Sequence, residues 1–253
     1  MKEIKITETA QKIIRRLFAR NSVNTLHSDP ELTAIFDNFA FDENIKYTEI
    51  LDEKTRIMSI LASTIGGRAM TQFKTMVNAA LNVGLKPREI REVVYQSIPY
   101  VGFSRVIDFL LAMNDVFENN DIKLPLDDQA TTDMTTRIEK GREWMESIFG
   151  KESIEQMFKD APHGQEHINN FLAGYCFGDF YTRNGVTMQQ RELMTFCFLA
   201  SMGGTEPQMY SHACGNKNVG NSKEYMVAAV TAMIPYIGFP RALNALTAIN
   251  KAY

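Results

Sequence analysis

A histidine and an acid preceding it are the residues of this chain whose types best suit catalysis. His212 carries an imidazole, which can give and take a proton near neutral pH. Glu192 lies in the preceding predicted helix and could orient the imidazole, or interact with its charge, if the two helices pack antiparallel. The alternative for His212 is a buried or interfacial histidine bonded to a neighbouring helix, and that for Glu192 is a surface carboxylate paired with Arg191 or another neighbour. Our first hypothesis is proton transfer by His212, oriented by Glu192.

Four further side chains could bind a substrate. An arginine could hold a carboxylate through the two-pronged fork of its guanidinium group. A phenol or an amide could hydrogen-bond an acidic or lactone substrate. The candidates of these types near His212 are Arg191, Tyr210, Gln208 and Asn218.

The residue spacing does not suit a metal or a bound cofactor. Cys214 and His212 form an HxC pair, but no third or fourth ligand stands at metal-binding spacing. His163 and His167 lie four residues apart in the polar segment DAPHGQEHINN, for which we expect a solvated helix face. The GGR and GGT segments lack the spacing of a phosphate-binding loop. We expect no metal and no cofactor.

The chain contains an internal repeat. SIPYVGFSR at 97–105 matches MIPYIGFPR at 233–241, which is an offset of 136 residues. The same offset pairs Gly67, Gln72, Asn82 and Gly84 with Gly203, Gln208, Asn218 and Gly220. Arg56 pairs with Arg191 at an offset of 135, which implies one inserted residue. LFARNS and IFGKES extend the likeness into the segment that leads each repeat.

Each repeat reads as a series of helices. Apolar residues recur at helical spacing over 52–65 and 188–202, and again over 72–83 and 208–219. A third helix begins at LKPREIREVV or at NSKEYMVAAV and then meets Pro99 or Pro235, where we expect a kink or break. Gly102 and Gly238 should allow close helix approach before a last helix. We predict an all-α fold built from a tandem helical repeat, with residues 119–133 as the linker.

Comparison of the two repeats shows which candidate residues occur in both of them. His212 corresponds to Met76, so only the second repeat has the histidine. Arg191, Gln208 and Asn218 have identical counterparts in the first repeat, which favours a structural role for them.

Composition excludes several classes of protein. The net charge of −3, with 27 basic residues scattered among 30 acidic ones, argues against binding to nucleic acid. The N-terminal sequence has charges in every turn, so we expect no signal peptide and no membrane segment. Cys176, Cys197 and Cys214 form an odd set without a close pair, and we expect a cytoplasmic protein.

The order of these elements resembles the carboxymuconolactone decarboxylase family and its alkylhydroperoxidase D-like relatives. The matching segments are QRELMTFCFLASMGGTEPQMYSHACGNKNVG and IPYIGFPRALNAL in the second repeat, with LDEKTRIMSILASTIGG and IPYVGF in the first. The resemblance implies all-helical units that pack about an axis. We therefore expect a homo-oligomer, with a trimer favoured.

The resemblance also separates two kinds of chemistry. Redox-active relatives carry CxxC ahead of a histidine similar to His212, because two thiols must meet to cycle through a disulfide. The corresponding positions here are Thr205 and Gln208, which makes a thiol peroxidase the least favoured function.

Three functions follow in order of preference. The first is a cofactor-independent decarboxylase that acts on a small carboxylated lactone or related acid, with Arg191 as anion anchor and Tyr210 as oxyanion donor. The second is a catalytically silent oligomeric binding or scaffold protein, and the third is the thiol peroxidase. We expect residues 1–120 to form the first repeat and residues 134–253 to form the second, which would carry the site.

Overall fold

The computed structural model describes residues 5–18 and 28–253, and every regular element in these ranges is a helix. Thirteen α-helices and three short π- or 3₁₀-helical segments occur there, without a strand, which confirms the predicted all-α fold. Among these helices, none has the length and apolar character needed to cross a membrane.

The last four helices of the two repeats correspond in order, and different sets of leading elements precede them. The first contains two helices and two short helical segments, followed by four longer helices: α1 (Glu8–Phe18), α2 (Pro30–Asn38), η1 (Phe39–Glu43), η2 (Ile45–Tyr47), α3 (Glu53–Gly66), α4 (Met70–Asn82), α5 (Pro87–Val101) and α6 (Phe103–Glu118). The second contains α7 (Arg137–Phe149), α8 (Lys151–Lys159), α9 (Glu166–Phe171), η3 (Leu172–Tyr181), α10 (Met188–Met202), α11 (Glu206–Asn218), α12 (Lys223–Ile237) and α13 (Phe239–Ala252).

Local sequence explains where these helices begin and end. Asp52 caps α3 by accepting from the Thr55 amide, and Thr187 caps α10 by accepting from the Gln190 amide. The break expected at the internal prolines occurs later, because α5 and α12 continue past Pro99 and Pro235. Each helix ends at Gly102 or Gly238, whose φ angles of 91° and 77° favour glycine.

The expected role of these two glycines in close helix approach was therefore wrong. A Cβ atom at Gly102 would meet nothing within 4 Å. Close approach occurs instead at Gly66 of α3, where a Cβ atom would lie 2.6 Å from the Phe198 carbonyl oxygen of α10.

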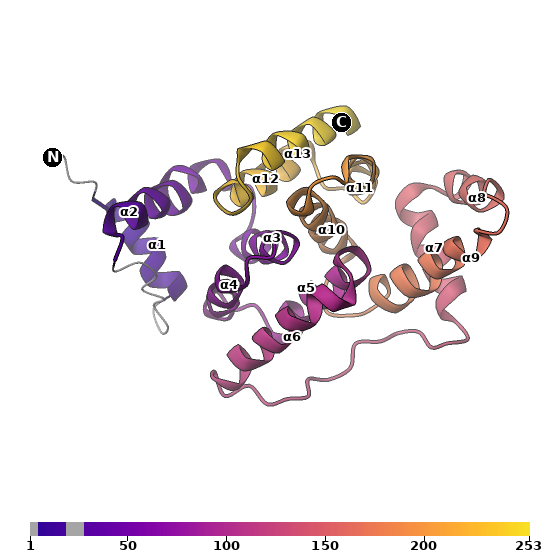
Figure 1. Ribbon diagram of the computed structural model, residues 1–253, viewed down its shortest axis with the longest axis horizontal. Coiled ribbons are helices and arrows are strands. Elements are labelled where there is room, and N and C mark those ends of the chain that lie inside the picture. Colours follow the sequence, from indigo (N-terminus) through magenta and orange to yellow (C-terminus); the bar gives the residue numbers. More distant parts are fainter. Residues whose placement is uncertain (1–4, 19–27) are drawn as a thin grey trace.

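The centre of the molecule is the contact between α3 and α10, which are corresponding helices of the two repeats (Figure 1). The leading helices α1 and α2 lie at one end of the view, and α7, α8 and α9 lie at the other. The larger hydrophobic core of the described residues runs through both repeats, from Leu17 and Phe73 to Phe196 and Met226, and a smaller cluster in the second repeat contains Cys176 and Tyr181. The repeats therefore share a core.

Two helices cross over between the repeats. Helix α5 of the first repeat packs against α10 and η3 of the second, while α12 of the second packs against α3, η1 and η2 of the first. Each repeat is thus covered by a helix that the other repeat supplies, and this exchange decides which residues meet in the site.

The leading segments match as well. Asn82 Nδ2 donates to the Leu17 carbonyl oxygen at 2.8 Å, and Asn218 Nδ2 donates to the Ile148 carbonyl oxygen at 2.9 Å. Leu17 begins LFARNS and Ile148 begins IFGKES, although residues 19–22 of the first motif lie outside the described ranges. Both asparagines fasten their own repeat's leading helix.

The predicted linker is a long extended strap without helix or strand, and it runs along one side of the molecule between α6 and α7 (Figure 1). Arg91 donates to the Leu126 carbonyl oxygen at 3.0 Å and also to the Asp127 carbonyl oxygen. Thr132 donates to the Gly178 carbonyl oxygen at 2.7 Å, so both repeats hold the strap.

Candidate functional site

His212 and Glu192 meet in the interior of the second repeat. Nδ1 of His212, on α11, lies 2.9 Å from Oε2 of Glu192, on α10. The Glu192 side chain is fully buried, so the surface alternative for this residue was wrong. A buried carboxylate needs a partner to offset its lost hydration, and the imidazole supplies one. The contact that we considered for antiparallel packing of the two helices is present, and it equally fits the alternative of a buried histidine bonded to a neighbouring helix.

Small and amide residues of α11 make room for this pair. A Cβ atom at Gly215 would lie 2.5 Å from Glu192 Oε2, so only glycine leaves space for the carboxylate. Asn216 Nδ2 donates to the main-chain oxygens of Glu192 at 2.9 Å and of His212 at 2.8 Å. Asn221 donates in turn to Asn216 Oδ1 at 2.7 Å. The two helices are thereby fixed where the acid meets the imidazole.

Two tyrosines extend the hydrogen bonding away from Glu192. The Tyr181 hydroxyl, at the end of η3, donates to Glu192 Oε1 at 2.7 Å and lies 2.8 Å from Thr195 Oγ1. The Tyr100 hydroxyl, from α5 of the first repeat, lies 2.9 Å from the Tyr181 hydroxyl. Cys176 Sγ donates weakly to Tyr100 at 3.6 Å. Both oxygens of the Glu192 carboxylate therefore accept a hydrogen bond.

Burial keeps the two tyrosine hydroxyls and the Cys176 thiol of this hydrogen-bonded series protonated. It raises the pKa of the Tyr100 and Tyr181 hydroxyls well above the ordinary value, and nearby negative charge, including that of Glu192, raises it further. Burial also raises the pKa of the Cys176 thiol to about 12. At neutral pH these three groups are uncharged donors rather than nucleophiles.

Aromatic rings flank the imidazole. The Phe149 and Tyr100 rings meet His212 edge to face at centroid distances of 5.4 Å and 5.5 Å. Trp144, 6.4 Å from the Tyr181 ring, belongs to the same aromatic cluster. Nε2 of His212 has no hydrogen-bond partner within residues 5–18 and 28–253, and the side chain keeps 10% exposure. Nε2 is therefore the ring atom that can exchange a proton with a bound molecule.

Arg191 lies apart from this arrangement. Its side chain is fully buried and ion-paired with Glu92 of α5 at 3.1 Å. Its guanidinium group also donates to Gln96 Oε1 at 2.9 Å and to the Arg183 carbonyl oxygen at 2.6 Å. These contacts use its charge to join the repeats, and they favour the structural alternative over an anion anchor.

The other three candidates point in different directions. Tyr210 faces α13, with Lys251 Nζ 4.4 Å from its ring centroid, and so does not accompany His212. Asn218 is engaged with the Ile148 carbonyl oxygen. Gln208 is exposed and lies one helical turn before His212, on the same face of α11. Of the three, only Gln208 has a position suited to substrate contact.

The cysteines do not form a redox centre. Cys176 and Cys197 are buried, Cys214 is partly exposed, and all three are free thiols. Thr205 and Gln208 occupy the CxxC positions, so the described part of the chain contains no CxxC pair. In the same ranges, no group of three or more His, Cys, Asp or Glu side chains is placed to hold a metal ion.

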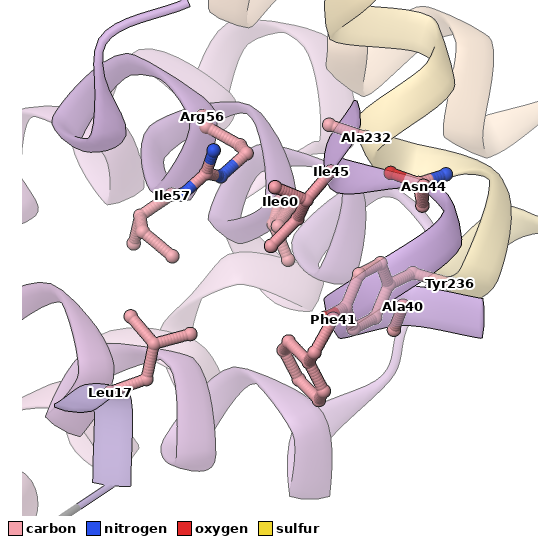
Figure 2. Close-up of a pocket in the computed structure, with 10 residues that line it drawn as sticks. All are labelled: Leu17, Ala40, Phe41, Asn44, Ile45, Arg56, Ile57, Ile60, Ala232 and Tyr236. Carbon is pink, nitrogen blue, oxygen red and sulfur yellow. The ribbon is translucent and has the colours of Figure 1, made fainter. Parts of the chain in front are cut away.

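The first repeat contains a small pocket at the place that corresponds to the surroundings of Glu192 (Figure 2). Its free space is about 10 Å³, close to what one water molecule needs. Arg56, Ile57 and Ile60 of α3 line it, and Ala232 and Tyr236 of α12 close it from the other repeat. By the repeat offsets these positions match Arg191, Glu192, Thr195, Gln96 and Tyr100.

Sequence reasoning missed the tyrosine pair. Tyr100 belongs to the IPYVGF motif, which we interpreted as packing because IPYIGF occurs in both repeats. Tyr181 ends a π-helical segment without a recognisable motif. A signal was available for Gly215, because Ala79 occupies its position in the repeat that lacks the histidine.

Comparison with known proteins gives two matches. A family model described as "Carboxymuconolactone decarboxylase family" matches residues 30–115 and again residues 167–251. The chain is 22% identical over 118 residues to 4-carboxymuconolactone decarboxylase of Acinetobacter baylyi, an alignment that covers 46% of this chain and 87% of that protein. The two matched segments correspond to the two halves identified from the sequence.

Proposed function

The chain is a two-repeat member of the carboxymuconolactone decarboxylase family, and on that basis we propose a carboxy-lyase that acts on a small carboxylated lactone or related acid. His212 is the proton donor, and Glu192 orients it. The observation that carries the proposal is the 2.9 Å contact between Glu192 and His212. The first repeat has Ile57 and Met76 at these positions, so we propose one site per chain.

The proposed reaction has two steps. The bond between the substrate and its carboxylate carbon breaks, carbon dioxide leaves, and the electron pair moves into a conjugated carbonyl to form an enolate. The enolate then takes the proton from His212 Nε2 at carbon, and the imidazole regains a proton from water. Glu192 stabilises the imidazolium that gives up this proton.

The contacts with substrate are assigned from position. Gln208 is the proposed contact, because it is exposed and shares the His212 face of α11. Phe149 and Tyr100 limit the approach to the imidazole and favour a flat substrate. Arg191 and Asn218 do not contact substrate in this proposal, because their polar groups are engaged elsewhere. Tyr210 does not either, because its ring faces Lys251 of α13 and its hydroxyl contacts Cys214.

The test is the rate of 4-carboxymuconolactone loss, followed by absorbance and by carbon dioxide release. We expect His212→Ala to lower kcat by about 10²- to 10⁴-fold, which is the contribution of a positioned acid. Met76→Leu changes the corresponding residue of the first repeat while conserving volume, and should leave kcat unchanged. Full turnover in His212→Ala would contradict the proposal. No turnover by the unmodified protein would favour the silent binding protein.

A further inference from the structure

We propose that Tyr100, a residue of the first repeat, is a positioning residue for the acid of the second repeat. The inference rests on the proposed function of His212. Tyr100 reaches the site because α5 crosses over to pack on α10 and η3. It contacts the site twice, through its ring against the imidazole at 5.5 Å and through its hydroxyl against Tyr181 at 2.9 Å.

The direction of the hydrogen bonds follows from the carboxylate. A carboxylate only accepts, so the Tyr181 proton points to Glu192 Oε1. The Tyr181 oxygen can then only accept from Tyr100, whose proton must point toward it. Each bond in such a chain polarises the next, so Tyr100 strengthens the donation by Tyr181 to Glu192.

The series of hydrogen bonds from Tyr100 through Tyr181 determines how Glu192 meets the imidazole. With Oε1 held by Tyr181, Oε2 faces Nδ1 of His212. A proton on Nδ1 is then favoured, which leaves Nε2 as the nitrogen that exchanges with substrate. Without the Tyr100 hydroxyl, Tyr181 would lose one of the groups that orient its own hydroxyl. The carboxylate would then be held less firmly toward the histidine.

The chain carries its own control at Tyr236. This residue occupies the position of Tyr100 in the second repeat and closes the pocket of the first (Figure 2). Its hydroxyl makes no hydrogen bond within the described ranges, whereas that of Tyr100 meets Tyr181. Ile57 and Ile60 also stand in the first repeat where the second has Glu192 and Thr195. Loss of either tyrosine hydroxyl removes one oxygen atom from a corresponding buried position. Only the Tyr100 hydroxyl is joined by hydrogen bonds, through Tyr181, to a carboxylate.

The experiment compares Tyr100→Phe with Tyr236→Phe in the full chain. The first readout is the pair of ¹⁵N chemical shifts of the His212 ring at one fixed pH, which report the tautomer and its hydrogen bonds. The chain has four histidines, so the His212→Ala variant identifies the signals. The second readout is kcat and KM with 4-carboxymuconolactone.

We expect Tyr100→Phe to move the His212 ring shifts and to lower kcat about threefold to tenfold with little change in KM, the size of one hydrogen bond. Tyr236→Phe should change neither. Ring shifts that stay fixed in Tyr100→Phe, or that move equally in both variants, would overturn the inference. If the unmodified protein does not turn over this substrate, the proposed function fails, and the ring shifts alone still decide whether Tyr100 positions His212.

Discussion

The site around His212 and the pocket around Ile57 occupy matching places in the two repeats, yet one is a hydrogen-bonded network and the other is mostly apolar. A buried polar network is stable only while each member has its partners, because an unsatisfied group retains the full cost of its lost hydration. Replacement of one member therefore favours replacement of all. Five polar or small residues of the second-repeat site have apolar counterparts in the first repeat. Thr195, Glu192, His212, Gly215 and Asn216 correspond in this order to Ile60, Ile57, Met76, Ala79 and Ala80.

What the two regions retain in common is equally informative. Arg56 and Arg191 are both buried, and Asn82 and Asn218 both fasten a leading helix. These residues serve the fold, which both repeats need. The proposed acid and the residue that orients it, His212 and Glu192, are by contrast replaced by Met76 and Ile57 in the first repeat.

The largest effect is expected from Glu192→Gln. The substitution keeps the size of the side chain but removes the charge that stabilises the imidazolium, so we expect kcat to fall by about 10²- to 10⁴-fold. Glu53→Gln alters the carboxylate paired with Arg56 in the first repeat and should leave kcat unchanged. Equal losses in both variants would show that the two regions do not differ in function.

A smaller effect is expected from Gly215→Ala. The added methyl group would lie 2.5 Å from Glu192 Oε2, so the carboxylate must shift away from His212. We expect a loss of about 1–3 kcal/mol in the free energy of unfolding, as for other overpacked sites, together with reduced turnover. Ala79→Gly is the matched change and should cost about 1 kcal/mol of helix stability with normal turnover. Urea unfolding and the decarboxylation rate test both, and a fully active Gly215→Ala would contradict the described geometry.

The smallest effects are expected at high pH, where burial alone predicts the same behaviour beside the site and in the shared core. Burial raises the pKa of Cys176 and Cys197 to about 12, and raises that of Tyr100 and Tyr236 as well. The unfolded chain loses these protons at a lower pH than the folded chain does. The contribution of these groups to the free energy of unfolding is therefore fully present below about pH 9 and falls as the pH rises toward 12. Each thiol contributes up to about 1.4 kcal/mol per pH unit.

Urea midpoints between pH 8 and pH 11 test this expectation. Cys176→Ala removes a thiol beside the site, and Cys197→Ala removes one from α10 in the shared core. Both variants should show a shallower loss of stability with pH than the unmodified protein. A shallower loss in only one of them would mean that the network, rather than burial, controls these protons.

Much of the fold could be predicted because helix signals are local. The expected helices at 188–202 and 208–219 correspond to α10 and α11. The contact of Glu192 with His212 was one of the two alternatives considered for that carboxylate, and the structure contains it. The offset between repeats also indicated correctly that Asn218 serves packing.

The rest depended on contacts between distant segments. Arg191 precedes Glu192 by one residue, which turns it about 100° around the helix and toward α5 rather than toward His212. Nothing near Arg191 in the sequence indicates that α5 presents Glu92 there. The role of the Tyr100 hydroxyl could likewise not be predicted, because Tyr236 occupies the same position of the repeated motif and only the surroundings of the two tyrosines differ.

The exchange of α5 and α12 between the repeats has a genetic consequence. A gene shortened to the half that encodes His212 would lack Gln96 and Tyr100, because the other half encodes these two residues of the site. A gene shortened to the other half would lose Ala232 and Tyr236, which close its pocket. Either half alone would therefore lack side chains that complete its interior in this chain, so the two copies depend on each other.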